Sequence, residues 1–307
     1  MKNGWRELAF AKINLGLFLG PSRAHDGRHE LATVMQSISL ADELTLAPTG
    51  EGDERDEIVC PGVSGPPQDN LAAIALRRFR EATGWRSPPL RLSILKRIPV
   101  AAGLAGGSAD AAAALRLAAR ASGLGDASSP EGERLLGELA RELGADVPAQ
   151  LAPGRWLATG AGEHLQALPA PSAPFGVLVL ALDHSLSTAA VYREADRLGL
   201  GRQPDELAAL ARALHQALAN GAPLPAAELL HNDLQRAAVS LCPPIDAALA
   251  QARAAGATVA LVSGSGPTVL GLFQSPTAAR DGAARLAGRV PAPVCAQPVH
   301  GAAPSGA

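Results

Sequence analysis

The sequence Pro99-Val-Ala-Ala-Gly-Leu-Ala-Gly-Gly-Ser-Ala-Asp-Ala-Ala112 joins a strand-like run to an apolar helical run through a loop of small residues. Its glycines permit backbone conformations that other residues avoid, and they let a ligand approach the main chain closely. Amide N–H groups at a helix start bind anions, and the helix dipole favours negative charge there. The stretch therefore predicts a phosphate-binding loop. The same residues also fit a flexible turn capped by Ser108, with Asp110 complementing the helix dipole.

Two common nucleotide-binding motifs do not fit this loop. No Gly-x-x-x-x-Gly-Lys-Ser/Thr sequence occurs, which excludes a Walker A loop. The chain does not open with a strand–helix–strand unit, so a Rossmann dinucleotide site fits poorly. The loop is therefore expected to belong to a different class of phosphate-binding fold.

The part of the chain around this loop is expected to form a sheet with helices. Residues 10–19 alternate so that Lys12 and Asn14 share one strand face, while apolar side chains share the other. Further strands are expected at 29–40, at 42–47, within the strand-and-loop stretch 48–68, and at 88–95. Helices are expected at 70–83, 108–122 and 130–143.

The pattern changes after Pro174. Here the periodicity predicts a strand at 175–182, helices at 205–219, 225–240 and 244–255, a strand–loop–strand unit at 257–273, a helix at 276–287 and a last strand near Val294. This order resembles a ferredoxin-like layer. We therefore expect an α+β fold in two domains, an N-terminal mixed-sheet domain at 1–168 and a ferredoxin-like C-terminal domain at 169–307.

Composition narrows the class of protein. The chain is 47% hydrophobic and 18% charged, which is typical of a globular protein. A net charge of −2 and only 3% aromatic residues make nucleic acid an unexpected partner. Cys60, Cys242 and Cys295 form no CxxC pair, which argues against a disulfide framework or a cysteine zinc site. The longest apolar run, 175–182, is too short to cross a membrane, and we expect a cytoplasmic protein.

Two further motifs carry residues that suit a catalytic site. Gly144-Ala-Asp-Val-Pro148 places an acid between apolar neighbours, although an aspartate in such a turn also serves as a local cap. Val262-Ser-Gly-Ser-Gly-Pro-Thr-Val269 presents backbone amides to a substrate or simply reverses the chain. Lys12 is one of only three lysines in the chain, and by itself it also fits an ordinary surface strand position.

Taken together, these motifs resemble those of the galactokinase, homoserine kinase, mevalonate kinase and phosphomevalonate kinase (GHMP) superfamily, over about residues 8 to 300. Within the superfamily, the chain is similar to the family of 4-diphosphocytidyl-2-C-methyl-D-erythritol kinases. The segments that carry this similarity are Ala11-Lys-Ile-Asn-Leu15, Asp26-Gly-Arg-His-Glu-Leu31, Gly103-Leu-Ala-Gly-Gly-Ser-Ala-Asp110, Gly144 to Pro148 and Val262 to Pro267.

The resemblance implies a GHMP kinase fold with an ATP-binding N-terminal domain and a C-terminal substrate domain. It also implies transfer of the ATP γ-phosphoryl group to the 2-hydroxyl of 4-diphosphocytidyl-2-C-methyl-D-erythritol, in the non-mevalonate route to isoprenoids. Magnesium is expected to arrive with ATP, and no dedicated protein metal site is expected. A monomer or weak homodimer is expected. The open alternatives are another GHMP kinase of homoserine or mevalonate type, and a catalytically silent nucleotide-binding relative.

The resemblance also assigns roles to individual residues. It implies that Asp146 accepts or orients the substrate hydroxyl proton and that Lys12 keeps Asp146 ionised and stabilises charge near the transferred group. It implies that the adenine is flanked by Asn70 and Lys96. The phosphates are expected along the backbone of Pro99, Val100, Ala101, Ala102, Gly103, Leu104, Ala105, Gly106, Gly107, Ser108 and Ala109.

The remaining implied residues bind the second substrate. His29 is expected to contact the cytosine edge and Tyr192 to stack on the base. The family usually has tyrosine where this chain has Arg28, whose guanidinium plane can also stack on a base. The full set of expected substrate-binding residues is Asn14, Arg28, His29, Thr188, Tyr192, Ser263, Gly264, Ser265 and Gly266.

Overall fold

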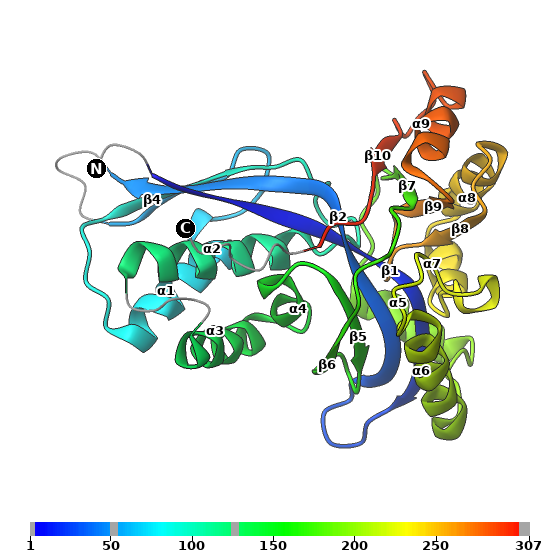
Figure 1. Cartoon of the computed structure of the whole chain (residues 1–307), viewed down its shortest axis with the longest axis horizontal. Helices are drawn as coiled ribbons and strands as arrows, with labels where there is room; N and C mark the ends of the chain where they lie inside the picture. The colour runs from blue at the N-terminus through cyan, green and yellow to red at the C-terminus, as the bar shows by residue number, and fades with distance from the viewer. Residues whose placement is uncertain (1–3, 50–54, 124–128, 301–307) are drawn as a thin grey trace.

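The computed structural model describes residues 4–49, 55–123 and 129–300, and it shows the expected α+β fold (Figure 1). Positions 50–54 of the predicted strand-and-loop stretch lie outside the described residues. One mixed sheet has the order β3-β4-β2-β5-β6, with β1 paired to β2. Its strands are β1 (Trp5–Ser22), β2 (His29–Pro48), β3 (Glu57–Val59), β4 (Leu90–Leu95), β5 (Arg155–Thr159) and β6 (His164–Leu168). Only β3 and β4 pair in parallel; the other described pairs in this sheet are antiparallel.

Helices cover one face of this sheet (Figure 1). They are η1 (Pro67–Asp69), α1 (Leu71–Thr83), α2 (Gly106–Ser122), α3 (Pro130–Leu143) and α4 (Val147–Leu151). The buried face of α2 is made almost entirely of alanine and leucine, and it packs against α1 and the sheet in one core. Such small side chains allow close packing. The helix begins two residues earlier than expected, because Ala105 rather than Ser108 is its N-cap.

One strand, β2, replaces the two strands expected at 29–40 and 42–47, so that prediction was wrong. A charged residue, Asp42, interrupts the apolar pattern there, yet its backbone still pairs with Ala9 of β1. Asp42 is fully buried, and its carboxylate accepts hydrogen bonds from the amides of Arg97 and Ile98 and from Lys96. Because its charge is fully partnered, it does not end the strand.

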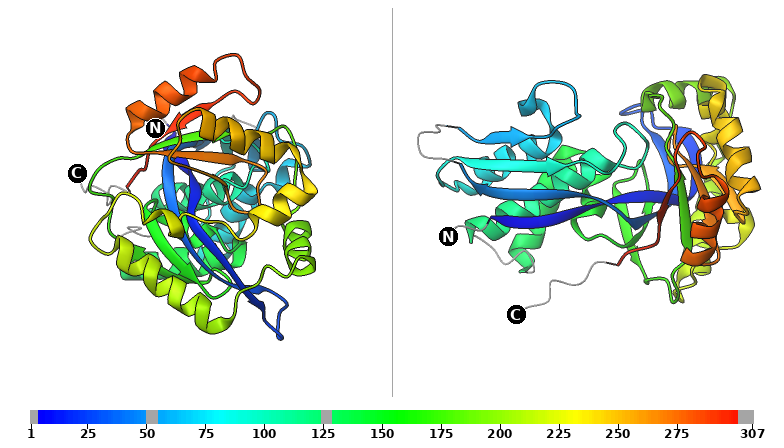
Figure 2. Two further views of the ribbon diagram at one scale, coloured as in Figure 1. Left: turned by 90° about the vertical axis from the view of Figure 1, so that its right-hand side faces the viewer. Right: turned by 90° about the horizontal axis from the view of Figure 1, so that it is seen from above.

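The second sheet has the antiparallel order β10-β7-β9-β8, and its helices lie on the outer side of the molecule (Figure 2). The strand and helix sequence matches the expected ferredoxin-like layer. Its elements are β7 (Gly176–Leu180), α5 (Thr188–Arg197), α6 (Pro204–Leu218), η2 (Ala227–Leu229), α7 (Gln235–Leu241), α8 (Pro244–Ala254), β8 (Val259–Val262), β9 (Val269–Phe273), α9 (Pro276–Arg285) and β10 (Val294–Ala296).

Two helices of this layer differ from the sequence prediction. Helix α5 was not predicted, and the helix expected at 225–240 was wrong, because only η2 and α7 form there. Between them, the backbone at His231 and Asp233 hydrogen bonds to Leu17 of β1. The side chain of Asn232 donates to two backbone carbonyls of the 262–264 loop. These tertiary contacts take the place of helical hydrogen bonds.

The long strands β1 and β2 connect the two layers (Figure 2). Ala11 and Ile13 of β1 share a buried core with Phe175, which directly precedes β7, and with Val177 of β7. The first sheet ends at Leu168 and the second begins at Gly176, while the domain division at 168/169 stays a prediction. Within the described residues, no helix is both long and apolar enough to cross a membrane.

Candidate active site

A cavity of about 1220 Å³ lies where the two layers meet. Typical sites for one small ligand have volumes of about 300–1,000 Å³, so this cavity has room for more than one. Its wall includes most of the residues that the sequence singled out. The exceptions are Leu104, Ala109 and Ser263, which are 1%, 1% and 0% exposed and lie in the core behind the wall.

The predicted phosphate loop forms one side of the cavity. Helix α2 begins at Gly106, so the amides of its first turn have no partner within the helix. A Cβ atom added to Gly107 would meet nothing within 4 Å, whereas one on Gly106 would face Ile98 and Lys96. Gly103 has φ 73°, and a Cβ there would lie 2.5 Å from the carbonyl oxygen of Ser263. The glycines thus leave open space beside the helix N-terminus and allow close contact with the second layer.

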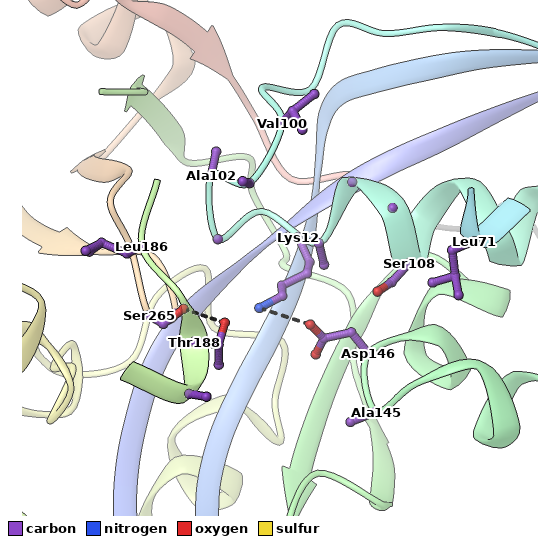
Figure 3. Close-up of a pocket in the computed structure, with 18 of the residues that line it drawn as sticks. Lys12, Leu71, Val100, Ala102, Ser108, Ala145, Asp146, Leu186, Thr188 and Ser265 are labelled. Carbon is purple, nitrogen blue, oxygen red and sulfur yellow. Dashed lines mark hydrogen bonds and ion pairs between the residues drawn. The ribbon is translucent and has the colours of Figure 1, made fainter. Parts of the chain in front are cut away.

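The predicted catalytic pair comes together in the middle of the cavity (Figure 3). Nζ of Lys12, on β1, lies 3.8 Å from Oδ2 of Asp146, in the turn before α4. The Lys12 side chain is 9% exposed, whereas that of Asp146 is 41% exposed and caps no helix amide. Lys12 is therefore a buried cation rather than a surface strand lysine, and Asp146 has oxygens free to meet a ligand.

A chain of hydrogen bonds fixes Lys12. Its Nζ atom donates to Oδ1 of Asn14 at 3.0 Å, Asn14 donates to Thr33 at 2.7 Å, and Thr33 donates to the backbone oxygen of Gly16 at 2.6 Å. Lys12 and Asn14 therefore do share a strand face. Thr33 was not predicted as a site residue. It lies on β2 and comes near Asn14 because the register of the two strands places it opposite Leu17 of β1.

The loop at 262–268 closes another side of the cavity. Oγ of Ser265 lies 3.1 Å from Oγ1 of Thr188, and the Ser263 hydroxyl donates to the backbone oxygen of Gly103 at 3.2 Å. Gly264 is close enough to the active-site strand that a Cβ there would lie 3.7 Å from Nζ of Lys12. Asn232, which sequence reasoning missed, supports the loop with its two hydrogen bonds of 2.8 Å.

Lys96 lies under the phosphate loop and binds two carboxylates that were not predicted. Its Nζ atom donates to Asp110 at 2.8 Å and to Asp42. Burial lowers the pKa of Lys96, but the two carboxylates outweigh this effect and raise it overall. Burial raises the pKa of Asp110 to about 7 despite the neighbouring ammonium, and Oδ1 of Asp110 is buried without a partner among the described residues. The charge of Lys96 is therefore already paired in the protein.

The residues predicted for the cytidine group lie together in the wall of the same cavity. The rings of His29 and Tyr192 lie 5.3 Å apart at 45°. Nε2 of His29 lies 2.7 Å from Oδ1 of Asp196, a residue that the sequence analysis did not single out. Arg28 also lines the cavity, and its guanidinium donates to the backbone oxygen of Ala161 at 2.6 Å. Burial and the charge of Asp146 raise the pKa of Tyr192 to about 12, so its hydroxyl stays protonated at neutral pH.

No metal centre is built from these side chains. Across the described ranges, no three His, Cys, Asp or Glu residues lie together in a way that would hold a metal ion. The site therefore combines a glycine-rich loop at a helix N-terminus, a lysine–aspartate pair and two contacting rings in one cavity.

Comparison with known proteins gives the class. Residues 70–154 match the family model described as GHMP kinases N terminal domain, and residues 199–292 match the model described as GHMP kinases C terminal. A solved homoserine kinase from Cytophaga hutchinsonii covers 98% of this chain and 96% of its own, with a TM-score of 0.66 and 15% identity, which shows a shared fold. The fold is that of a GHMP kinase, and the glycine-rich loop lies within the residues that match the N-terminal model.

More similar proteins narrow the class to one family. A Streptomyces coelicolor protein named 4-diphosphocytidyl-2-C-methyl-D-erythritol kinase is 43% identical over 275 residues, which is 88% of each chain. A solved 4-(cytidine 5'-diphospho)-2C-methyl-D-erythritol kinase has a TM-score of 0.73 and 34% identity, covering 97% of this chain and 100% of its own. The chain belongs to the family of 4-diphosphocytidyl-2-C-methyl-D-erythritol kinases.

Proposed function

We propose that this protein is an ATP-dependent kinase that phosphorylates the 2-hydroxyl of 4-diphosphocytidyl-2-C-methyl-D-erythritol, giving the 2-phosphate and ADP for isoprenoid synthesis by the non-mevalonate route. One observation carries the proposal. The Lys12–Asp146 pair, the glycine-rich loop and the rings of His29 and Tyr192 all line a single cavity. A phosphoryl donor and an acceptor alcohol need to meet in one site, beside groups that take a proton and stabilise charge.

The loop side of the cavity suits the phosphates of ATP. The first-turn amides of α2 supply hydrogen-bond donors, and the open space beside Gly107 admits an anion. Asn70 and Lys96 line the same side and would flank the adenine. Mg²⁺ would come with the nucleotide and be held mostly by phosphate and water, because it keeps several waters in such sites. Bound there, it would neutralise charge on the phosphates.

Asp146 is the group that takes the proton. Its exposed carboxylate accepts a hydrogen bond from the substrate hydroxyl. The proton moves to it as the oxygen attacks the γ-phosphorus, the bond from that phosphorus to the β–γ bridging oxygen breaks, and ADP leaves. Lys12 stabilises negative charge on the transferred group. The hydrogen bonds from Lys12 through Asn14 to Thr33 hold the ammonium in place for this task.

Residues 1–168 form the ATP-binding and catalytic domain, and residues 169–307 form the substrate domain. The protein works in the cytoplasm, which agrees with free thiols at Cys60, Cys242 and Cys295. It acts on a small molecule as a monomer or weak homodimer, with no nucleic acid or membrane as partner.

Substrate specificity tests the proposal directly. ADP release would be measured with purified protein, ATP, magnesium and 4-diphosphocytidyl-2-C-methyl-D-erythritol, beside parallel reactions with homoserine and mevalonate. Turnover with the cytidyl substrate alone is expected. Turnover with homoserine or mevalonate instead would identify another GHMP kinase, and no turnover with any of the three would favour a silent relative.

A further inference from the structure

One face of helix α5 holds His29, one of the two contacting rings. Tyr192 and Asp196 lie four residues apart on α5, so they occupy the same face of the helix. The tyrosine ring contacts the imidazole of His29 at 5.3 Å between centroids, and the aspartate meets Nε2 of His29 at 2.7 Å. His29 is 9% exposed, whereas the Asp196 side chain is 57% exposed. The imidazole is therefore held from two sides, with the carboxylate at the solvent edge.

This contact decides which ring nitrogen carries the proton. An ionised carboxylate only accepts hydrogen bonds, so Nε2 of His29 donates to Asp196. In a neutral imidazole the other nitrogen is then an acceptor. Nδ1 of His29 has no hydrogen-bond partner among the described residues, and His29 lines the cavity. Nδ1 is thus an unpaired acceptor on a residue that lines the cavity.

We propose that Asp196 is a positioning residue that selects the substrate base by fixing the tautomer of His29. This inference rests on the proposed function for the identity of the substrate. With its proton on Nε2, His29 accepts a hydrogen bond at Nδ1 from the exocyclic amino group of cytosine. In the same pose, uracil places a carbonyl oxygen there, and two acceptors oppose each other. Asp196 therefore favours an amino-pyrimidine over a keto-pyrimidine without touching the base.

Kinetics with two substrates tests the role. We would measure kcat and KM for the cytidyl substrate and for its uridine analogue in the wild type, Asp196→Ala and Asp196→Asn. Asp196→Ala is expected to raise KM for the cytidyl substrate about tenfold, to leave kcat within about threefold, and to lower the cytidine-to-uridine ratio of kcat/KM about tenfold. Asp196→Asn is expected to retain most of this ratio, because its amide oxygen still accepts from Nε2. Asp281→Ala, which removes an exposed carboxylate from α9, is the matched control and is expected to change neither value.

A spectroscopic measurement tests the tautomer independently of catalysis. In protein labelled with ¹⁵N-histidine, His29 is expected to carry its proton on Nε2. Its signals are assigned by their loss in His29→Gln. The Asp196→Ala variant is expected to lose the preference for the Nε2–H form. A wild-type proton on Nδ1, or an unchanged base preference in Asp196→Ala, would overturn the inference. If the wild type phosphorylates neither pyrimidine substrate, the proposed function fails. The inference about Asp196 is then decided by the tautomer of His29 and by the relative affinities for CDP and UDP, which calorimetry measures.

Discussion

Ser263 donates a hydrogen bond of 3.2 Å to the backbone oxygen of Gly103, and this contact joins the phosphate loop to the second layer of the protein. The two residues also approach through their backbones, because a Cβ on Gly103 would lie 2.5 Å from the Ser263 carbonyl oxygen. The shape of the cavity beside this loop therefore depends on a residue 160 positions away in the sequence.

Gly103→Ala is expected to weaken this junction. The new methyl group would clash with Ser263, and φ 73° is strained for alanine by about 1–2 kcal/mol. We expect a loss of about 2 kcal/mol or more in the free energy of unfolding and a raised KM for ATP. The matched control is Gly84→Ala, at φ 66° with nothing within 4 Å, which has the strain without the clash. Urea denaturation measures the free energy of unfolding, and ATP titration measures KM for ATP. Equal changes of these two values in Gly103→Ala and Gly84→Ala would contradict the role of the junction.

Asp146→Asn is expected to lower kcat on the order of a hundredfold or more, because the amide cannot take the hydroxyl proton. The side chain is 41% exposed and caps no helix amide, so the melting temperature should stay close to that of the wild type. Steady-state kinetics and thermal melting check both statements.

Lys12→Met keeps the length of the buried side chain but removes its charge. A comparable loss in kcat is expected, because the variant no longer stabilises charge on the transferred group. Some loss of stability is also expected, since Asn14 loses the Lys12 donor to its Oδ1 atom. A fully folded Lys12→Met protein with the wild-type rate would refute the proposed mechanism.

Gly107→Val is expected to raise KM for ATP about tenfold or more, because its side chain would enter the space next to the α2 N-terminus. Folding should be little affected, since the position is helical and a Cβ there meets nothing within 4 Å. Gly137→Val in α3 is the control for valine in a helix, with only Arg141 nearby. ATP affinity unchanged in Gly107→Val would argue against phosphate binding at this loop.

The charge cluster at Lys96 gives a pH-dependent stability. The pKa of Asp110 is raised to about 7 in the folded protein, so the folded state favours the protonated form. The stabilisation that comes from protonated Asp110 is fully present below the pKa of the unfolded chain, about 4. It is lost as the pH rises through about 7, the pKa in the folded protein. Asp110→Asn removes the titrating group. The free energy of unfolding of the variant minus that of the wild type should therefore be larger at pH 8.5 than at pH 5.5, by on the order of 1 kcal/mol. Denaturant unfolding at both pH values measures this, and a constant difference would contradict it.

Local patterns in the sequence predicted much of this site. The strand at 10–19, the phosphate loop and the turn at Asp146 each carry a short-range signal, and the structure brings Lys12, the loop and Asp146 into one cavity. The family resemblance is what links these separate motifs to one site. The roles of the individual residues stay predictions until the variants are measured.

The residues that were missed act through long-range contacts. Asp42 was expected to begin a separate strand, because the local sequence does not show that Lys96 and the amides of Arg97 and Ile98, 54 to 56 residues further along the chain, partner its carboxylate. Asn232 lay in an expected helix, but its amide group bonds to the 262–264 loop. Asp196 meets His29 only when two segments 167 residues apart in the sequence come together. No periodicity in the local sequence reports such pairings.

The core shared by the two layers has a consequence for how ligands enter. Ala11 and Ile13 pack with Phe175 and Val177, so a hinge-like opening of one layer from the other would expose buried apolar surface. Large rigid-body closure, common where domains touch through small polar interfaces, is therefore unfavourable. Nucleotide and alcohol are expected to enter and leave through movements of the loops that line the cavity, while the two sheets move as one body.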